Sequence, residues 1–258
     1  NKHFFGALKD TKRLKITHYN GTIIMSFAKI YTRGLLGLHA PLIEVEVHVS
    51  QGLPSLTIVG LPEAAVRESK DRVRSAIINS GFQFPTKRLT INLAPADLPK
   101  DGSRLDLPIA LGILIASGQI PENVTDNLEF IGELALDGQL RPITGILSIA
   151  IACQQLGHQL ILPEQNAQQA SQLPHFEVFA AQHLKDVCDH LSNQQPLQQY
   201  QASQTAAPDQ YRFDLADVKG QLRPRRALEI AAAGGHSLLF KGPPGTGKTL
   251  LASRLASI

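Results

Sequence analysis

Hydrophobic and polar residues alternate with a period of two in several short segments after residue 26. In residues 42–50, apolar β-branched side chains occupy the odd positions from 43 to 49, and mainly polar side chains occupy the even ones. This period is typical of a half-buried β-strand. Residues 55–59 form another β-rich run after a Gly-Leu-Pro turn, and residues 88–93 form a third. These patterns predict three strands.

Helical patterns separate the strands. Residues 63–80 predict a helix ended by Gly81, on which Glu68 and Arg72 have the i,i+4 spacing of a surface pair. Residues 106–117 predict a buried helix. The rest of this region alternates in the same way: a strand at 128–136, an Asp137-Gly138 hairpin to 139–143, a helix at 145–156, a strand at 159–162, a helix at 164–171, a strand at 177–179 and a helix at 182–191. The expected fold class is α/β or α+β.

The composition of the chain indicates where its domains begin and end. Residues 192–210 are rich in Gln, Ser, Ala and Pro and read as a linker between residues 25–191 and residues 211–258. Met25 is the single methionine and patterned sequence begins directly after it, so residues 1–24 are expected to be a disordered or non-native extension. This extension lacks the apolar centre of a signal peptide. Isolated Cys153 and Cys188 indicate neither a zinc site nor a disulfide framework, and a cytoplasmic location is expected.

A phosphate-loop motif follows the linker. The sequence Gly-Pro-Pro-Gly-Thr-Gly-Lys-Thr matches G-x-x-x-x-G-K-[ST], between a predicted strand at 237–241 and a predicted helix that starts near Gly247. Glycines let backbone N–H groups point at phosphate oxygens, Lys248 would reach the β- and γ-phosphates, and the Thr249 hydroxyl would ligate Mg²⁺. The ATP-binding residues expected in the loop are Gly242, Pro243, Pro244, Gly245, Thr246, Gly247, Lys248 and Thr249.

The flanks of the loop resemble the start of AAA+ modules in the magnesium-chelatase-like family. The resemblance rests on residues 217–221 (Asp-Val-Lys-Gly-Gln) and on residues 225–236. It implies that Val218, Gly220 and Gln221 lie against the adenine. A complete module also has an acidic Mg²⁺ ligand and an arginine finger, which residues 211–258 do not contain. Because one strand cannot form a parallel sheet, we expect this segment alone to be partly unfolded and to bind ATP weakly.

Residues 26–191 resemble the N-terminal domain of ComM/YifB-type magnesium-chelatase-like proteins. The resemblance is carried by four runs: residues 60–69, 92–97, 99–102 and 130–134. It implies that the chain is the N-terminal part of an ATP-dependent AAA+ motor, of the branch-migration or helicase type, acting in natural transformation. ATP and Mg²⁺ are the implied cofactors. The implied partners are branched or single-stranded DNA and further copies of the chain in a hexamer, with no membrane.

Part of this domain is also similar to the proteolytic domain of Lon, which uses a Ser–Lys dyad. Here Arg104 stands at the serine position with Ser103 one residue before it, and Leu147 stands at the lysine position. Leucine cannot accept a proton, so protease chemistry is not expected. The expected architecture is therefore a Lon-protease-like (ribosomal S5 domain 2-like) domain followed by the start of an AAA+ P-loop domain.

Lys87, Arg88, Lys100 and Arg104 place positive charge in two loops and are candidate contacts to DNA. Net charge adds no support: the chain carries +3 overall, but residues 1–24 alone carry +4. Two alternatives stay open beside the motor, namely a magnesium-chelatase-type ATPase subunit and a non-catalytic Lon-like binding module. ATP hydrolysis is expected of the longer parent protein rather than of this chain.

Overall fold

A computed structural model describes residues 18–19, 22–23, 27–100, 102–121, 125–201 and 213–258 of the protein. The chain divides into two compact units, residues 1–202 and residues 203–258. Most of residues 1–24 and the later part of the expected linker lie outside the described residues. Two short strands before residue 24, β1 (His18–Tyr19) and β2 (Thr22–Ile23), pair antiparallel with each other.

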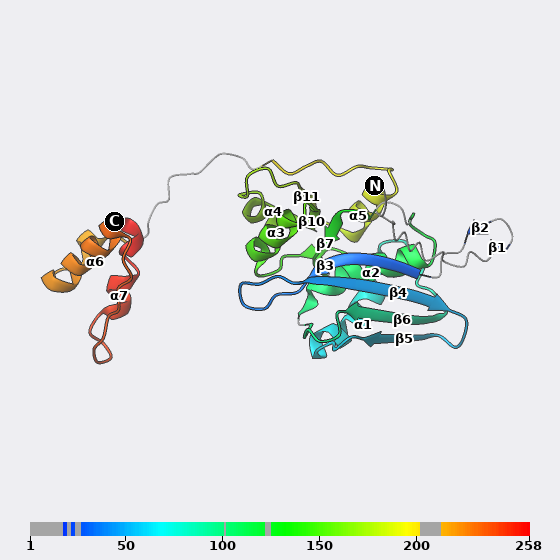
Figure 1. Ribbon diagram of the computed structural model, residues 1–258, viewed down its shortest axis with the longest axis horizontal. Coiled ribbons are helices and arrows are strands. Elements are labelled where there is room, and N and C mark those ends of the chain that lie inside the picture. The colour runs from blue at the N-terminus through cyan, green and yellow to red at the C-terminus, as the bar shows by residue number, and fades with distance from the viewer. Residues whose placement is uncertain (1–17, 20–21, 24–26, 101, 122–124, 202–212) are drawn as a thin grey trace, which may run out of the picture. The chain divides into compact units, whose positions relative to one another are not determined.

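A seven-stranded mixed sheet forms the centre of the first unit, with the strand order β11-β10-β7-β3-β4-β6-β5 (Figure 1). β4 pairs antiparallel with β3 and β6, whereas the other neighbours in the sheet are parallel. The strands are β3 (Phe27–Arg33), β4 (Leu42–Ser50), β5 (Ser55–Val59), β6 (Arg88–Ala94), β7 (Leu128–Phe130), β10 (Gln159–Pro163) and β11 (Val178–Ala181). The predicted strands at 42–50 and 55–59 are confirmed with the same bounds.

The predicted single strand at 128–136 is wrong in its extent. β7 ends at Phe130, and the chain leaves the sheet at Gly132, whose N–H donates to the carbonyl of Arg104. The remaining residues form β8 (Glu133–Leu134), which pairs antiparallel with β9 (Leu140–Arg141). The predicted Asp-Gly hairpin turn at 137–138 therefore joins β8 to β9.

The helices of the first unit follow the sequence prediction closely. They are α1 (Ala64–Asn79), the 3₁₀ turn η1 (Ser103–Leu105), α2 (Asp106–Ala116), α3 (Ile146–Gln155), α4 (Glu164–Ala170) and α5 (Leu184–Leu191). Among the described residues, no helix has the length and apolarity that crossing a bilayer requires.

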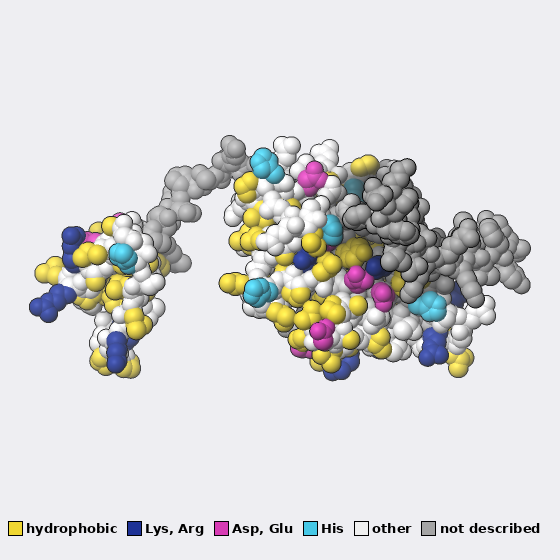
Figure 2. All heavy atoms as spheres, in the orientation of Figure 1, with side chains coloured by type: hydrophobic (Ala, Val, Ile, Leu, Met, Phe, Trp, Pro, Cys, Tyr) yellow, Lys and Arg dark blue, Asp and Glu magenta, His cyan; other side chains and the backbone are white. Residues whose placement is uncertain are grey.

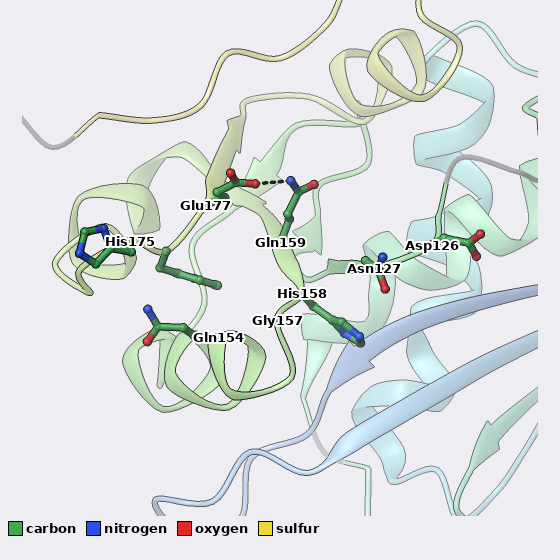
Figure 3. Close-up of a pocket in the computed structure, with 9 residues that line it drawn as sticks. Asp126, Asn127, Gln154, Gly157, His158, Gln159, His175 and Glu177 are labelled. Carbon is green, nitrogen blue, oxygen red and sulfur yellow. Dashed lines mark hydrogen bonds between the residues drawn. The ribbon is translucent and has the colours of Figure 1, made fainter.

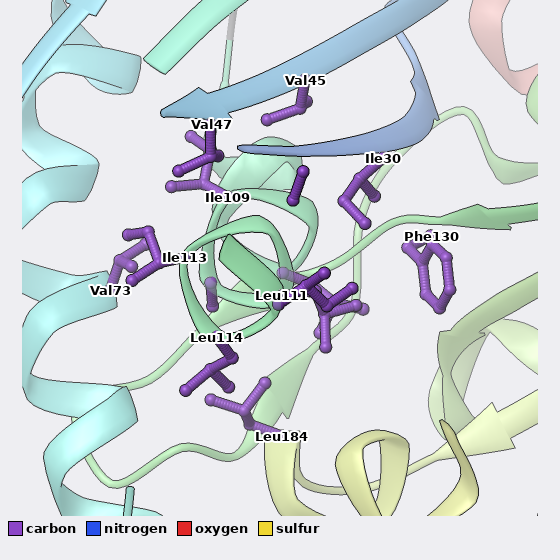
Figure 4. Close-up of a cluster of buried hydrophobic side chains, with 14 of the residues drawn as sticks. Ile30, Val45, Val47, Val73, Ile109, Leu111, Ile113, Leu114, Phe130 and Leu184 are labelled. Atoms are coloured by element: carbon purple, nitrogen blue, oxygen red, sulfur yellow. The ribbon is translucent and has the colours of Figure 1, made fainter. Parts of the chain in front are cut away.

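Helix α2 occupies the middle of the core, and every one of its residues is buried. Figure 4 shows its apolar side chains surrounded by Val45 and Val47 of the sheet, Val73 of α1 and Leu184 of α5. Gly112 permits the close contact with the sheet, because a Cβ there would lie 2.6 Å from a methyl carbon of Val47. An all-round apolar helix is stable only when it is covered on all sides, as here.

Two ion pairs with buried carboxylates lie within the first unit. Arg33 donates two hydrogen bonds of 2.6 Å to the carboxylate of Glu129, which also lies 2.9 Å from Nδ1 of His158. Arg72 donates to both carboxylate oxygens of Asp106, at 2.8 and 3.2 Å. The expected surface pair of Arg72 with Glu68 is therefore replaced by a bond to the buried Asp106.

The residues after α5, up to residue 201, pack on the sheet. The N–H of Tyr200 donates to the carbonyl of Val178 at 2.7 Å, and Gln199 bridges to Phe179. This part of the expected linker thus covers the outer side of β11.

The second unit is small. It contains the turn η2 (Leu215–Asp217), α6 (Leu222–Gly234), α7 (Lys248–Ala252) and the turn η3 (Leu255–Ser257). Its core consists of four buried side chains with Phe240 packed beside them: Leu215, Val218, Leu228 and Leu251. The predicted strand at 237–241 is not formed. A strand needs a hydrogen-bonding neighbour, and the described residues of this unit contain no other strand to pair with it.

Candidate nucleotide-binding site

The phosphate-loop motif forms an exposed turn between residue 241 and α7. Gly245 and Gly247 have φ angles of +79° and +80°, a conformation that strains residues with a side chain. The Thr246 hydroxyl donates to the carbonyl of Pro243 at 2.9 Å and closes the turn from within. Gly247 is the N-cap of α7, as the sequence predicts.

Lys248 joins the two ends of this loop. Its ammonium donates to the carbonyl of Gly242 at 2.9 Å and to that of Pro243 at 2.7 Å. The amine is therefore held on the loop itself, close to where the motif would bring phosphate. Thr249 follows in the first turn of α7 and is exposed. This donor set is what a nucleotide triphosphate with Mg²⁺ requires, namely a positive charge, a hydroxyl and a flexible glycine backbone.

The residues expected to lie against adenine have different surroundings. The side-chain amide of Gln221 donates to the carbonyl of Thr246 at 3.4 Å, so the structure brings Gln221 to the phosphate loop. Gly220 is exposed with a φ of +75°. Val218 is buried in the small core, so its side chain is not free to cover a base. The structure thus joins Gln221 to the loop and uses Val218 for packing.

Two arginines that sequence reasoning did not single out support this arrangement. Arg225 of α6 donates to the carbonyl of Val218 at 2.9 Å, which fixes the segment before Gln221. Arg254 is buried, donates to the carbonyl of Leu250 at 2.8 Å and lies over the ring of Phe213. In the sequence, both arginines are ordinary basic residues without a motif, and only the fold reveals their contacts.

The four candidate DNA contacts do not form one cluster. Lys87 and Arg88 are exposed at the start of β6, whereas Arg104 lies beyond its other end. A seven-residue strand separates them by roughly 20 Å. On the face in view in Figure 2, Lys and Arg side chains of the first unit are dispersed rather than gathered into a basic patch.

The prediction that Lys100 is an exposed DNA contact is wrong. Its side chain is fully buried and its ammonium donates to the carbonyl of Pro95. Burial lowers the pKa of Lys100, while the nearby carboxylate of Asp97 opposes this effect. An amine without access to solvent cannot be presented to a phosphate backbone in this conformation.

Ser103 and Arg104, at the position of the Lon serine, line a polar pocket of about 310 Å³ together with Glu133 and Thr144, whereas Leu147 is not among the residues that line it. The Ser103 hydroxyl donates to the carboxylate of Glu133, and Arg104 donates to the carbonyl of Thr144 at 3.5 Å. Leu147 is partly exposed on α3 and offers no base. The residue at the lysine position therefore cannot supply the amine that a Ser–Lys dyad needs.

A larger pocket of about 430 Å³ lies at the amino ends of β7, β10 and β11 (Figure 3). Gln159 donates to Glu177 across it, and the ring of His158 points away from Gln154 and His175. Within the described residues, no group of His, Cys, Asp and Glu is arranged to hold a metal ion. The phosphate loop is therefore the best-defined candidate site.

Comparisons with known proteins agree with the motifs. A family described as "Subunit ChlI of Mg-chelatase" matches residues 45–166, and one described as "Magnesium chelatase, subunit ChlI" matches residues 214–258. The YifB protein of Salmonella typhimurium is 52% identical over 238 residues, which cover 91% of this chain and 46% of that protein. The competence protein ComM of Haemophilus influenzae is 49% identical over 238 residues, covering 91% and 47%.

Similarity to proteases is weaker. Lon protease 2 of Bacillus subtilis is 26% identical over 173 residues, which cover 61% of this chain and 31% of that protein. The chain spans about half the length of the YifB and ComM relatives it matches. The two family matches fall on the two units of the structure, and the high identity extends over nearly all of the chain. The chain belongs to the magnesium-chelatase-like family that includes the YifB and ComM proteins.

Proposed function

We propose that residues 211–258 begin an ATP-binding AAA+ module and that residues 25–191 form a Lon-like domain without protease activity. The observation that carries the first part is the loop at 242–249, where Lys248 bridges two carbonyls and Gln221 contacts Thr246. These contacts gather the polar groups of the motif at one place. Leu147 at the position of the Lon lysine, with Ser103 bonded to Glu133, supports the second part.

Each residue of the loop has a separate task in this proposal. Lys248, which donates to the carbonyls of Gly242 and Pro243, would bind the β- and γ-phosphates instead, and these charged acceptors form stronger hydrogen bonds than the neutral carbonyls. The exposed Thr249 hydroxyl would ligate Mg²⁺, and Gln221, whose side-chain amide donates to the Thr246 carbonyl, would lie beside the bound nucleotide. The Mg²⁺ ion supplies neutralisation of the phosphate charge. Hydrolysis requires groups from the remainder of the module, so activity belongs to the longer parent protein.

For the whole protein, we infer an ATP-driven motor of the branch-migration or helicase type that acts on DNA during natural transformation, as a hexamer. The relative named competence protein ComM supports this role, because it is about half identical across nearly all of the chain. Lys87, Arg88 and Arg104 remain candidate phosphate contacts in this proposal. Salt-sensitive binding of forked DNA by the full-length protein would support the role.

A magnesium-chelatase subunit is the second candidate. The descriptions of both matching families favour it, since they name a subunit of Mg-chelatase. ATP-dependent insertion of Mg²⁺ into a porphyrin by the full-length protein distinguishes this function from the motor. If neither DNA remodelling nor chelation is found, the remaining candidate is a binding module without catalysis.

The decisive experiment replaces Lys248 with alanine in the full-length protein and measures ATP hydrolysis. Loss of the charged phosphate contact is expected to lower the rate by at least about a hundredfold, since removal of one such group costs about 3 kcal/mol of transition-state stabilisation. Lys241→Ala is the matched control, because Lys241 is exposed directly before the loop. Equal rates for the Lys248→Ala protein and the unchanged protein would exclude the proposed site.

A further inference from the structure

Charge is unevenly distributed along the first unit. Residues 27–201 contain 12 basic and 17 acidic side chains, which gives a net charge of −5. Residues 63–88, which comprise α1 and its connection to β6, contain six basic and three acidic side chains, which gives +3. The rest of residues 27–201 therefore carries −8. A positive segment in an otherwise acidic unit concentrates the attraction for anions at one place.

The basic side chains of residues 27–201 differ in whether they have a partner. Five of the twelve are paired with carboxylates, namely Lys29, Arg33, Arg72, Arg141 and Lys185. Lys100 is buried, and Arg104 donates to a backbone carbonyl. Among the described residues, the remaining five form no ion pair, and they are Arg67, Lys70, Arg74, Lys87 and Arg88. All five fall within the positive segment.

Three of these cations share one side of α1. Arg67, Lys70 and Arg74 have the spacing i, i+3, i+7, which places them within an arc of about 60° and over about 10 Å of the helix. Arg67 and Arg74 are exposed, and Lys70 is half-buried. The apolar side of α1, with Val66 and Val73, is buried in the core. The side with the three cations therefore borders solvent.

The positive side of α1 continues beyond the end of the helix. The central carbon of the Arg74 guanidinium lies 4.9 Å from the centre of the Phe84 ring. Phe84 and Lys87 line a pocket of about 290 Å³, whose other described lining residues carry no charge. Lys87 is exposed. Arg67, Lys70, Arg74 and Lys87 thus form one line of cations, the α1 track, which ends beside Phe84.

We propose that the α1 track binds the phosphate backbone of DNA, an inference that rests on the DNA-remodelling role proposed above. Over about 10 Å of duplex, one strand carries about three phosphates, which matches the three cations on α1. Glu63 and Asp71 border the track, but within the described structure neither is paired with it, so the cations can bind phosphate without breaking an ion pair. A lipid surface fits less well, because the apolar side of α1 is buried and cannot insert into a membrane.

Binding of labelled forked DNA to the full-length protein at several salt concentrations tests the track. The combined change Arg67→Gln, Lys70→Gln and Arg74→Gln is expected to reduce the slope of log K against log salt by about two to three. At 0.1 M salt this corresponds to roughly hundredfold weaker binding. The combined change Arg67→Lys and Arg74→Lys keeps the charges and should retain the slope. Circular dichroism should show all variants folded, since glutamine and lysine both favour a helix.

The matched control makes the same change in net charge elsewhere in the unit. Lys29→Gln, Arg141→Gln and Lys185→Gln together remove three exposed cations that are already paired with carboxylates. This variant should bind DNA with nearly the slope of the unchanged protein. Equal losses in the two triple variants would overturn the proposal, because net charge alone would then explain them. If the unchanged protein binds DNA and the α1 variant binds it equally well, the track is wrong and the motor role stands. No DNA binding by the unchanged protein would exclude both.

Lysine footprinting gives a second measurement that needs no substitution. The unchanged full-length protein is treated with an amine-acetylating reagent, with and without forked DNA, and the modified lysines are quantified by mass spectrometry. DNA is expected to slow the acetylation of Lys70 and Lys87 severalfold and to leave that of Lys29 and Lys185 unchanged. Equal protection of all four lysines, or none at Lys70 and Lys87, would contradict the proposal. Equal protection by polyglutamate at the same charge concentration would assign the track to an acidic protein instead.

Discussion

At the scale of single residues, Asp106 is expected to make stability depend on pH. Burial raises its pKa from 3.8 to about 6, although Arg72 acts in the opposite direction. At pH values between these two pKa values, the Asp106 carboxyl keeps its proton in the folded protein and has lost it in the unfolded chain. Stability from this group is therefore highest below pH 4 and falls as the pH rises to about 6, by about 3 kcal/mol at most.

The check is chemical denaturation of the unchanged protein and of Asp106→Asn at pH values from 4 to 6.5. The amide does not titrate, so the free energy of unfolding of the variant should decline less over this interval. Glu44→Gln, which removes an exposed carboxylate paired with Lys29, serves as the comparison. Parallel pH profiles for the unchanged protein and Asp106→Asn would refute the assignment.

Residue-level features were predictable from the sequence only where a motif specifies them. Glycine, lysine and threonine at fixed spacing indicate the phosphate loop before any fold is known. The same reasoning placed Lys100 in solvent and paired Arg72 with Glu68, and both expectations were wrong. Local spacing reports which side chains can meet along one helix or loop. It carries no information about Asp106, which approaches Arg72 from a different helix.

At the scale of elements, the turn from β5 to α1 depends on Gly60. Its φ is +94°, and a Cβ would lie 2.1 Å from a backbone oxygen of β6. Gly60→Ala is therefore expected to lower the free energy of unfolding by about 2–4 kcal/mol, combining backbone strain with a clash that no side-chain rotation relieves. Gly81→Ala is the matched control, because Gly81 has a φ of +87° with no atom within 4 Å of the added Cβ. The control should lose about 1–2 kcal/mol, and equal losses would show that the clash is absent.

Element boundaries were predictable where a periodic pattern met a clear stop. The alternation in residues 42–50 and the Gly-Leu-Pro turn before residue 55 gave the bounds of β4 and β5. Residues 237–241 have the composition of a strand, yet they form none because no neighbouring strand is present among the described residues of that unit. Strand formation depends on a partner elsewhere in the chain, and a local pattern cannot supply it.

At the scale of the whole first unit, the buried pair of Arg33 and Glu129 connects the two parts of the sheet. β7 pairs with β3 at one position, Tyr31 opposite Glu129. Few backbone hydrogen bonds therefore join the part of the sheet formed by β3, β4, β6 and β5 to the part formed by β7, β10 and β11. The two 2.6 Å bonds from Arg33 and the contact with His158 lie at this junction. The sheet is therefore expected to be held together here by side chains as much as by its backbone.

Glu129→Gln tests this expectation, because it leaves the charge of Arg33 buried without its partner. Loss of one member of such a pair costs about 3–5 kcal/mol. Glu44→Gln removes the exposed pair with Lys29 and should cost less than about 1 kcal/mol. Hydrogen exchange should show faster exchange in β7 and β10 of the Glu129→Gln protein, with β4 and β6 less affected. If the loss of stability matches that of Glu44→Gln, the backbone alone holds the junction, and the sheet needs no buried charges to join its two parts.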